Sequence, residues 1–436
     1  MTPAPDVQAA DPGILLPAAQ SAMKKLWRII ALLFAVMFVG LLDRSNAGFA
    51  ALTMNGEIGM SPAQFGLGLG LFAVGEACFS VPSNYAALKL RPHRWIALLV
   101  LAWSVIAMAM AAITNPRGFY ILRFLLGVAE AGTVPCVMLI VAGWIPPVHR
   151  ARSMAIIVAG SGLAAIVGPP LGAAVFSAEG LLGLSGWRWL FLVEGAGTTV
   201  LAVVLMRLLP GDPGSAKWLN EDERAWLTSE LQSAQTGAAE EAHDTQKSWH
   251  HSALLATMNF AVAASASVLA VWLPPVARET MNLTITQVGL VSAPVYGLGV
   301  LGAILVGMWS DRVGRRLAFM AAFSGLAALA LAFTAVSVVP MVSFIALVGS
   351  VVAIRCTGGV FFAAVSEGVR GKGRGHAFGL FVMFGSLGAF AGNWLFGILR
   401  EATGTFAGGI AGLAIMMTLT AIVALLASRI APKGKA

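Results

Sequence analysis

Long apolar runs, separated by short polar segments, recur along the whole chain. Each run is long enough to cross the roughly 30 Å hydrocarbon core of a membrane as a helix, which rises about 1.5 Å per residue. The predicted fold class is therefore an all-α membrane protein with twelve transmembrane helices. The predicted spans are 27–50, 63–86, 95–114, 118–143, 153–175, 187–209, 251–274, 286–308, 317–337, 341–364, 377–399 and 407–429.

One longer polar segment divides these spans into two groups of six. We expect an N-terminal half at 27–209, a linker at 210–250 and a C-terminal half at 251–429, with tails at 1–26 and 430–436. Two six-helix halves with a binding site between them are typical of many secondary transporters.

Two further expectations concern the polar segments. Residues 1–26 are polar and rich in Ala and Pro, without the order of regions that marks a cleaved signal peptide, so we expect a disordered tail. The spacing of Trp and Leu in residues 215–233 predicts a short amphipathic helix in the linker.

Composition and charge narrow the class of protein. The chain is 58% hydrophobic and only 11% charged, which excludes an ordinary soluble domain. With both termini placed in the cytoplasm, 21 of the 28 Lys and Arg residues fall in cytoplasmic segments or at their edges, as the positive-inside rule requires. We therefore predict a multi-pass protein of a bacterial cytoplasmic (inner) membrane. The net charge of +8 is explained by this topology, and no nucleic acid partner is expected.

The sequence contains no GxSxG, HExxH or Walker motif, which argues against hydrolysis and ATP-driven transport. Its three cysteines, Cys78, Cys136 and Cys356, lie inside predicted spans without metal-ligand spacing. We expect no enzymatic activity, cofactor or metal.

Charged residues inside two spans are the main functional signal, because such charges are costly in a membrane. Asp43 and Arg44 interrupt the first span, and Arg123 and Glu130 lie seven residues apart on one face of the fourth. Two interpretations remain open: a polar path for a ligand, or an ion-pair network that only joins helices. Arg44 in particular could serve only as the partner of Asp43.

The loop after the eighth span, GMWSDRVGRR (307–316), resembles the cytoplasmic-loop signature of the major facilitator superfamily. The resemblance implies a gating role, rather than substrate contact, for Asp311, Arg312, Arg315 and Arg316. The corresponding loop of the first half, YAALKLRPHR (85–94), lacks the Asp, so a latch there must be weaker or built differently.

Five further segments resemble the anion:cation symporter family of this superfamily: LLDRSNAGFAALTMN (41–55), VPSN (81–84), FYILRFLLGVAEAG (119–132), GWRWLFLVEG (186–195) and AKWLNEDERAWL (216–227). Members carry tartrate, phthalate, sugar acids and related carboxylates, mostly with protons. The resemblance implies that Asp43 and Glu130 handle protons and that Arg44 and Arg123 bind the anion. Protonation of the two acids would then release the two arginines for the substrate.

The chain departs from the family pattern in its second span, where Glu76 replaces a Tyr. Glu76 is expected near the depth of Glu130, where two acids could share a proton. It could handle protons or bind substrate, or it could join two helices.

Two residues of the second half are candidates for substrate binding. Arg355 could face the cavity and bridge the anion to Arg123, or it could pair with Glu367 or with an acid of the first half. Asn393 could contact substrate or make a packing hydrogen bond. Tyr296, Asn259 and Trp272 are more typical of helix packing than of a cavity wall.

The predicted function is proton-coupled uptake of an organic carboxylate, such as a sugar acid, a tartrate-like diacid or an aromatic acid, by alternating access. The expected partners are a small organic anion, protons and the lipid bilayer, and the expected state is a monomer. Two alternatives stay open: proton-coupled efflux of drugs or organic cations, and a membrane nutrient sensor that does not transport.

Overall fold

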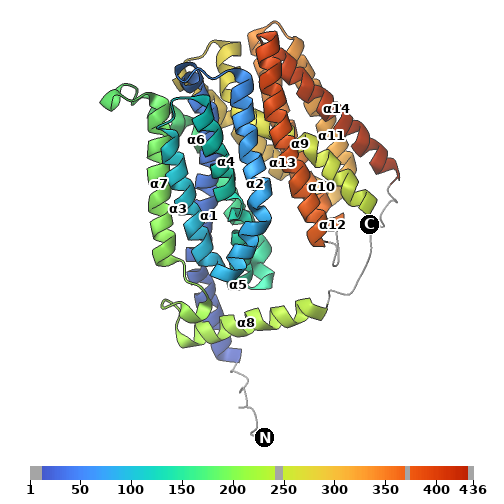
Figure 1. Ribbon diagram of the computed structural model, residues 1–436. Helices are drawn as coiled ribbons and strands as arrows, with labels where there is room; N and C mark the ends of the chain where they lie inside the picture. The colour runs from blue at the N-terminus through green and yellow to red at the C-terminus, as the bar shows by residue number, and fades with distance from the viewer. Residues whose placement is uncertain (1–11, 241–248, 369–373, 431–436) are drawn as a thin grey trace.

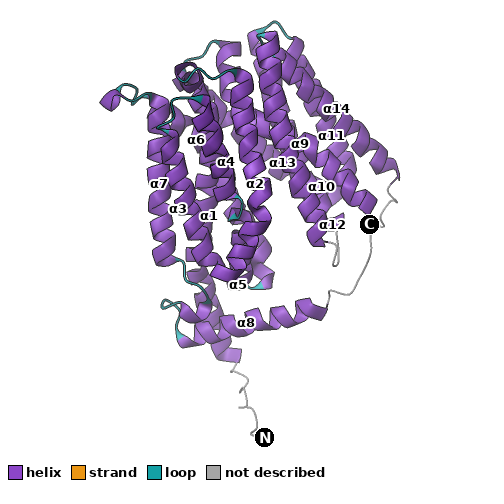
Figure 2. Cartoon of the chain, in the orientation of Figure 1, coloured by secondary structure: helices purple, strands orange, loops and turns teal. Residues whose placement is uncertain are grey.

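The computed structural model describes residues 12–240, 249–368 and 374–430, and these residues form helices joined by short loops, with no strand among them (Figures 1 and 2). Twelve candidate membrane spans lie within them, which confirms the predicted fold class. The helices are α1 (Pro12–Glu57), α2 (Pro62–Leu90), α3 (Pro92–Met110), α4 (Pro116–Glu130), α5 (Thr133–Trp144), α6 (Pro147–Phe176), α7 (Gly186–Leu208), α8 (Glu221–Glu240), α9 (Trp249–Met281), α10 (Ile285–Val313), α11 (Arg316–Val336), α12 (Pro340–Gly368), α13 (Arg374–Thr403) and α14 (Ala407–Ile430), with 3-10 turns at Leu181–Gly183 and Pro213–Ser215.

Local sequence explains where several spans begin. The helices α2, α3, α4 and α6 have proline in their first turn, where its fixed φ and missing N–H fit a helix start. Ser61 and Thr284 cap α2 and α10, and each exchanges hydrogen bonds with a glutamine three residues later. These signals define the helix starts more sharply than hydropathy does.

The fourth span is interrupted, which its apolar pattern did not indicate. The helix α4 ends at Glu130 and α5 begins at Thr133. A side-chain carbon added at Gly132 would lie 1.9 Å from Ser83 Oγ, so α2 can approach the break only because residue 132 is glycine. The interruption therefore directly follows one of the predicted proton-handling acids.

The first helix extends beyond the predicted span, and the prediction of a disordered tail is wrong for residues 12–26, which are helical. Ser21 Oγ and Lys25 Nζ donate hydrogen bonds to the Glu223 carboxylate of α8, over 2.5 and 2.7 Å. The ordering comes from a partner helix, which tail composition alone cannot reveal.

The amphipathic helix of the linker begins at Glu221 rather than at residue 215. Asn220 and Glu223 exchange hydrogen bonds between side chain and backbone, and this reciprocal cap defines the start. Figure 1 shows α8 lying across one end of the bundle, near the start of α1. We call this the linker end, and the opposite end the far end.

The two halves, α1–α7 and α9–α14, meet mainly through α2 with α13, α6 with α10 and α1 with α9. Glycines allow the close approach: a side-chain carbon at Gly66 would lie 2.3 Å from the Asn393 carbonyl oxygen, and one at Gly397 would lie 2.3 Å from the Pro62 oxygen. Small residues at these crossings thus set the fit between the halves.

Hydrogen bonds join the halves at the far end. Arg278 of α9 donates to the Leu52 carbonyl over 2.8 Å. The Glu401 carboxylate of α13 accepts from Ser61 Oγ over 2.6 Å and from the Ala63 backbone N–H over 3.0 Å. These contacts hold the far end closed in this conformation.

Candidate functional site

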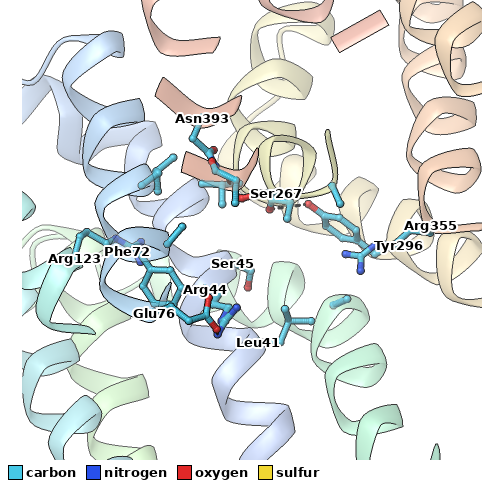
Figure 3. Close-up of a pocket in the computed structure, with 17 residues that line it drawn as sticks. Leu41, Arg44, Ser45, Phe72, Glu76, Arg123, Ser267, Tyr296, Arg355 and Asn393 are labelled. Carbon is cyan, nitrogen blue, oxygen red and sulfur yellow. Dashed lines mark hydrogen bonds and ion pairs between the residues drawn. The ribbon is translucent and has the colours of Figure 1, made fainter. Parts of the chain in front are cut away.

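A cavity of about 260 Å³ lies between the halves, with both halves contributing to its wall (Figure 3). Most of the wall is aliphatic or aromatic, as in most small-molecule sites. Its charged and polar lining residues are Arg44, Ser45, Glu76, Arg123, Ser267, Tyr296, Arg355 and Asn393. Five of these, Arg44, Glu76, Arg123, Arg355 and Asn393, are among the sequence-predicted site residues.

Arg44 joins three helices at the cavity wall. Its Nη2 contacts Glu76 Oε1 of α2 over 2.8 Å, and its Nε contacts Glu130 Oε2 of α4 over 2.9 Å. The guanidinium also lies 4.8 Å from the centre of the Phe72 ring. Arg44 therefore has direct partners other than Asp43.

The two acids that hold Arg44 differ in exposure. The Glu76 side chain is 27% exposed, whereas that of Glu130 is 3% exposed. Glu76 thus faces the cavity, and Glu130 lies behind it. Both acids contact the same guanidinium group, so their carboxylates lie close together.

Arg123 and Asp43 form a second, deeper part of the site. Both are buried, with 2% and 1% exposure. Arg123 lies within electrostatic range of Asp43, Glu130 and Glu194. Its Nε and Nη2 have no hydrogen-bond partner among the residues that the structure describes. Because buried donors are costly when unpaired, they are suited to an anion that enters the cavity.

Arg355 lies on the opposite wall, next to Tyr296 of α10 (Figure 3). The Tyr296 hydroxyl donates toward the carbonyl groups of Leu269 and Ala270, at 3.2 and 3.1 Å. Tyr296 was expected to serve packing, yet it also lines the cavity. Two alternative partners were predicted for Arg355. The Glu367 side chain lies outside the described residues, and among the described residues Arg355 forms no ion pair with an acid of the first half.

The Asn393 amide lines the cavity and is bonded at both ends by the protein. Its Nδ2 donates to Ser267 Oγ and to the Ala389 carbonyl, each over 2.8 Å, and its Oδ1 accepts from Trp272 Nε1 over 3.2 Å. These bonds correspond to the packing alternative and leave Ser267 oriented beside the cavity. Asn259 likewise donates to the Phe381 carbonyl.

The predicted gating residues lie at the linker end, away from the cavity. Asp311 at the end of α10 forms an ion pair with Arg316 at the start of α11, and Arg316 also contacts Ser310 Oγ over 3.2 Å. Gly314, with φ of 69°, makes the sharp turn between them. Arg312 and Arg315 are exposed.

One further acid of this region, Glu194 of α7, was not singled out from the sequence. It accepts a hydrogen bond from Asn46 of α1 and lies within electrostatic range of Asp43, Glu130 and Arg123. The rule that identified Asp43 and Glu130, a carboxyl group inside an apolar span, applies equally to Glu194.

Twelve membrane helices in two halves around a charged central cavity define the class of secondary membrane transporters. The sequence model of the Major Facilitator Superfamily matches residues 32–393. The chain therefore belongs to the major facilitator superfamily; it is a multi-pass transporter and not an enzyme.

Similar proteins include transporters with different named substrates. A protein of Agrobacterium vitis named "Putative tartrate transporter" is 34% identical over 95% of this chain and 93% of its own length. The quinolone resistance transporter of Acinetobacter baumannii is 31% identical over 90% and 91%. The crystal structure of a D-xylose-proton symporter matches with a TM-score of 0.75 and 14% identity, over 94% of this chain and 99% of the symporter chain. At this identity the match shows a shared fold and nothing about substrate.

Proposed function

We propose that this transporter takes up an organic carboxylate together with protons. The observation that carries the proposal is the contact of Arg44 with both Glu76 and Glu130, beside an Arg123 whose Nε and Nη2 have no hydrogen-bond partner among the described residues. Cationic donors that are either unpaired or held by titratable acids suit an anion whose binding depends on protonation. The tartrate assignment in the name of a relative supports the same substrate class.

The proposed coupling is electrostatic. In the resting state Glu76 and Glu130 hold Arg44, while Asp43 and Glu130 offset the charge of Arg123. Protonation of these acids removes their attraction for the arginines, so the guanidinium groups become available to a carboxylate. Substrate and proton then stabilise the same state, which is the requirement for symport.

The second half gives the anion a contact that couples binding to rocking. Arg355 faces the cavity from the wall opposite Arg123. An anion that contacts both would draw the halves together. A hydroxy-diacid or sugar acid would use the arginines together with Ser45 and Ser267, whereas an aromatic acid would use the apolar wall and Tyr296.

The orientation follows from charge. With the linker end in the cytoplasm, the Lys- and Arg-rich segments lie on the cytoplasmic side of the inner membrane and the closed far end faces outward. Asp311, Arg312, Arg315 and Arg316 would act on the cytoplasmic side as gating residues.

Efflux of a drug is the second candidate, because the quinolone resistance transporter is similar over most of the chain and the cavity wall is largely apolar. Arginines on both walls disfavour a cationic substrate. A sensor that binds without transport would keep the Arg123 contact but would show no proton-driven uptake.

The test is a thermal-shift screen of the purified protein with tartrate, phthalate, sugar acids, a quinolone and cationic drugs at pH 5.5 and 7.5. Ligand at a hundred times its Kd stabilises the folded state by about 2.7 kcal/mol, so a true substrate should raise the melting temperature. We expect a carboxylate to stabilise the parent more strongly at pH 5.5 and to lose this effect in Arg123→Ala.

Arg117→Ala is the matched control, since Arg117 is exposed at the start of the same helix. It should respond to the carboxylate as the parent does. Stabilisation by cations alone, unchanged in Arg123→Ala, would contradict the anion site and favour efflux. A carboxylate that binds but is not accumulated by proteoliposomes under an inward proton gradient would favour the sensor.

A further inference from the structure

A second pocket lies within the first half, between α1, α6 and α7. Its volume is about 170 Å³, and it shares no lining residue with the central cavity. Aliphatic and glycine residues form most of its wall, and its polar residues are Asn46, Glu194 and Thr198. No step of the proposed transport cycle described above uses this pocket.

Glu194 connects this pocket to the charged site. It accepts the hydrogen bond from Asn46 and lies within electrostatic range of Asp43 on α1 and of Arg123 and Glu130 on α4. Among the residues that the structure describes, the parts of α3 and α6 next to Glu194 carry no charge: α3 contacts the adjacent Gly195 with Met108 and the Ser104 backbone, and the α6 residues of the pocket are glycine and aliphatic residues. The charged groups that face Glu194 therefore all belong to the predicted coupling site.

Charge balance shows that these acids cannot all be ionised without cost. Four carboxyl groups, those of Asp43, Glu76, Glu130 and Glu194, surround the two guanidinium groups of Arg44 and Arg123. Arg355, on the opposite wall, interacts with Tyr296. Full ionisation would leave this first-half cluster with two more negative charges than guanidinium groups, and binding of a proton neutralises one such charge.

The pocket itself contains polar atoms that lack partners. Thr198 is 1% exposed, and its hydroxyl has no hydrogen-bond partner in the described part of the chain; the same is true of Glu194 Oε1. A pocket of this size has room for a water molecule, which needs such polar partners. Among the described residues, the pocket therefore offers unpaired polar atoms on Glu194 and Thr198.

We propose that Glu194 is a further proton-binding residue. It exchanges its proton with Asp43 and Glu130, on the side of Glu194 where Asn46 of α1 contacts it. Together these acids let the first half hold two protons. The proton-binding part of this inference stands on charge and geometry, whereas its link to transport rests on the proposed function.

The first experiment is infrared spectroscopy of the purified, substrate-free protein, comparing parent and Glu194→Gln at pH 5.5. Glutamine keeps the shape and the acceptor for Asn46 but cannot bind the proton. We expect the variant to lose one C=O band of a protonated carboxyl group, and Glu194→Asp to shift that band. Glu221→Gln, an exposed acid of α8, is the control and should leave the band unchanged.

The outcomes separate the two proposals. Identical protonated-carboxyl bands in the parent and in both Glu194 variants would show that Glu194 is ionised and would overturn this inference. The transport link is tested with tartrate in proteoliposomes: Glu194→Gln should lose the stimulation by external acid and retain tartrate exchange. A parent that shows the band but no proton-driven uptake of any carboxylate that stabilises it in the thermal-shift screen would sink the proposed function and leave the proton site standing.

Discussion

At the scale of single residues, the arrangement around Arg44 depends on the shape of its side chain. Two different nitrogens of one guanidinium contact carboxylates on two different helices. The compact ammonium group of lysine cannot reproduce this fork, although it keeps the charge. The geometry of the group, in addition to its charge, is therefore part of the site.

We predict that Arg44→Lys lowers the initial rate of proton-driven tartrate uptake by about tenfold or more, since losing one hydrogen bond to a charged group costs about 1.5–3 kcal/mol. The measurement is uptake by proteoliposomes at matched protein content. Arg117→Lys makes the same change at an exposed site and should transport normally. Equal uptake by Arg44→Lys would mean that charge alone suffices.

The sequence indicated which charged residues lie inside the spans, but it did not indicate which of them contact one another. The cost of a charge inside a span singled out Asp43, Arg44 and Glu130 before any contact was known. Which acid contacts Arg44 depends on the distances between α1, α2 and α4. Those distances are set by packing between residues that are far apart in the sequence. The same rule applied to every span would have found Glu194 as well.

At the scale of helices, the junction of α1 with α8 depends on one carboxylate. Burial alone would raise the pKa of Glu223, but hydrogen bonds from Lys25, Ser21 and the Asn220 backbone outweigh it and lower the pKa below the usual 4.5. A lowered pKa in the folded state means that the ionised form stabilises the junction. This contribution is complete above the usual glutamate pKa and is lost as pH falls through the lowered value.

We therefore predict that Glu223→Gln increases hydrogen exchange of residues 12–26 at pH 7.5, because the ion pair with Lys25 is lost. Protection factors, corrected for intrinsic rates, are the measurement. Parent and variant should converge at a pH below the lowered pKa. Glu221→Gln changes an exposed acid of the same helix and should exchange as the parent does. Equal protection of parent and Glu223→Gln at pH 7.5 would contradict this role.

Hydropathy located the membrane helices well, because apolar length is a requirement for each span separately. It could not show the helical extension of α1 through residues 12–26, since those residues are ordered by contact with α8. It also could not show the break after Glu130, where the chain remains apolar and one glycine permits close approach of α2. Both features depend on a second helix.

At the scale of the whole molecule, transport by alternating access requires that the far-end contacts between the halves can open. Glu401 of α13 accepts hydrogen bonds from Ser61 and Ala63 at the start of α2, so it links one half to the other. Glu279 of α9 forms an ion pair with Arg400, the residue before Glu401, but both Glu279 and Arg400 belong to the second half. Glu401 and Glu279 are both exposed acids, but only Glu401 contacts the other half.

We predict that Glu401→Ala shifts the population toward the state that is open at the far end, roughly two- to fivefold, because the hydrogen bonds from Ser61 and Ala63 across the halves are lost. Spin labels at exposed positions of the two halves, Gly56→Cys and Thr286→Cys, would report the distance in a background with the three native cysteines replaced by alanine. Glu279→Ala should leave the distance distribution unchanged, because its ion pair does not cross between the halves. If both variants shift the distribution equally, loss of surface charge rather than a link between the halves controls the far end.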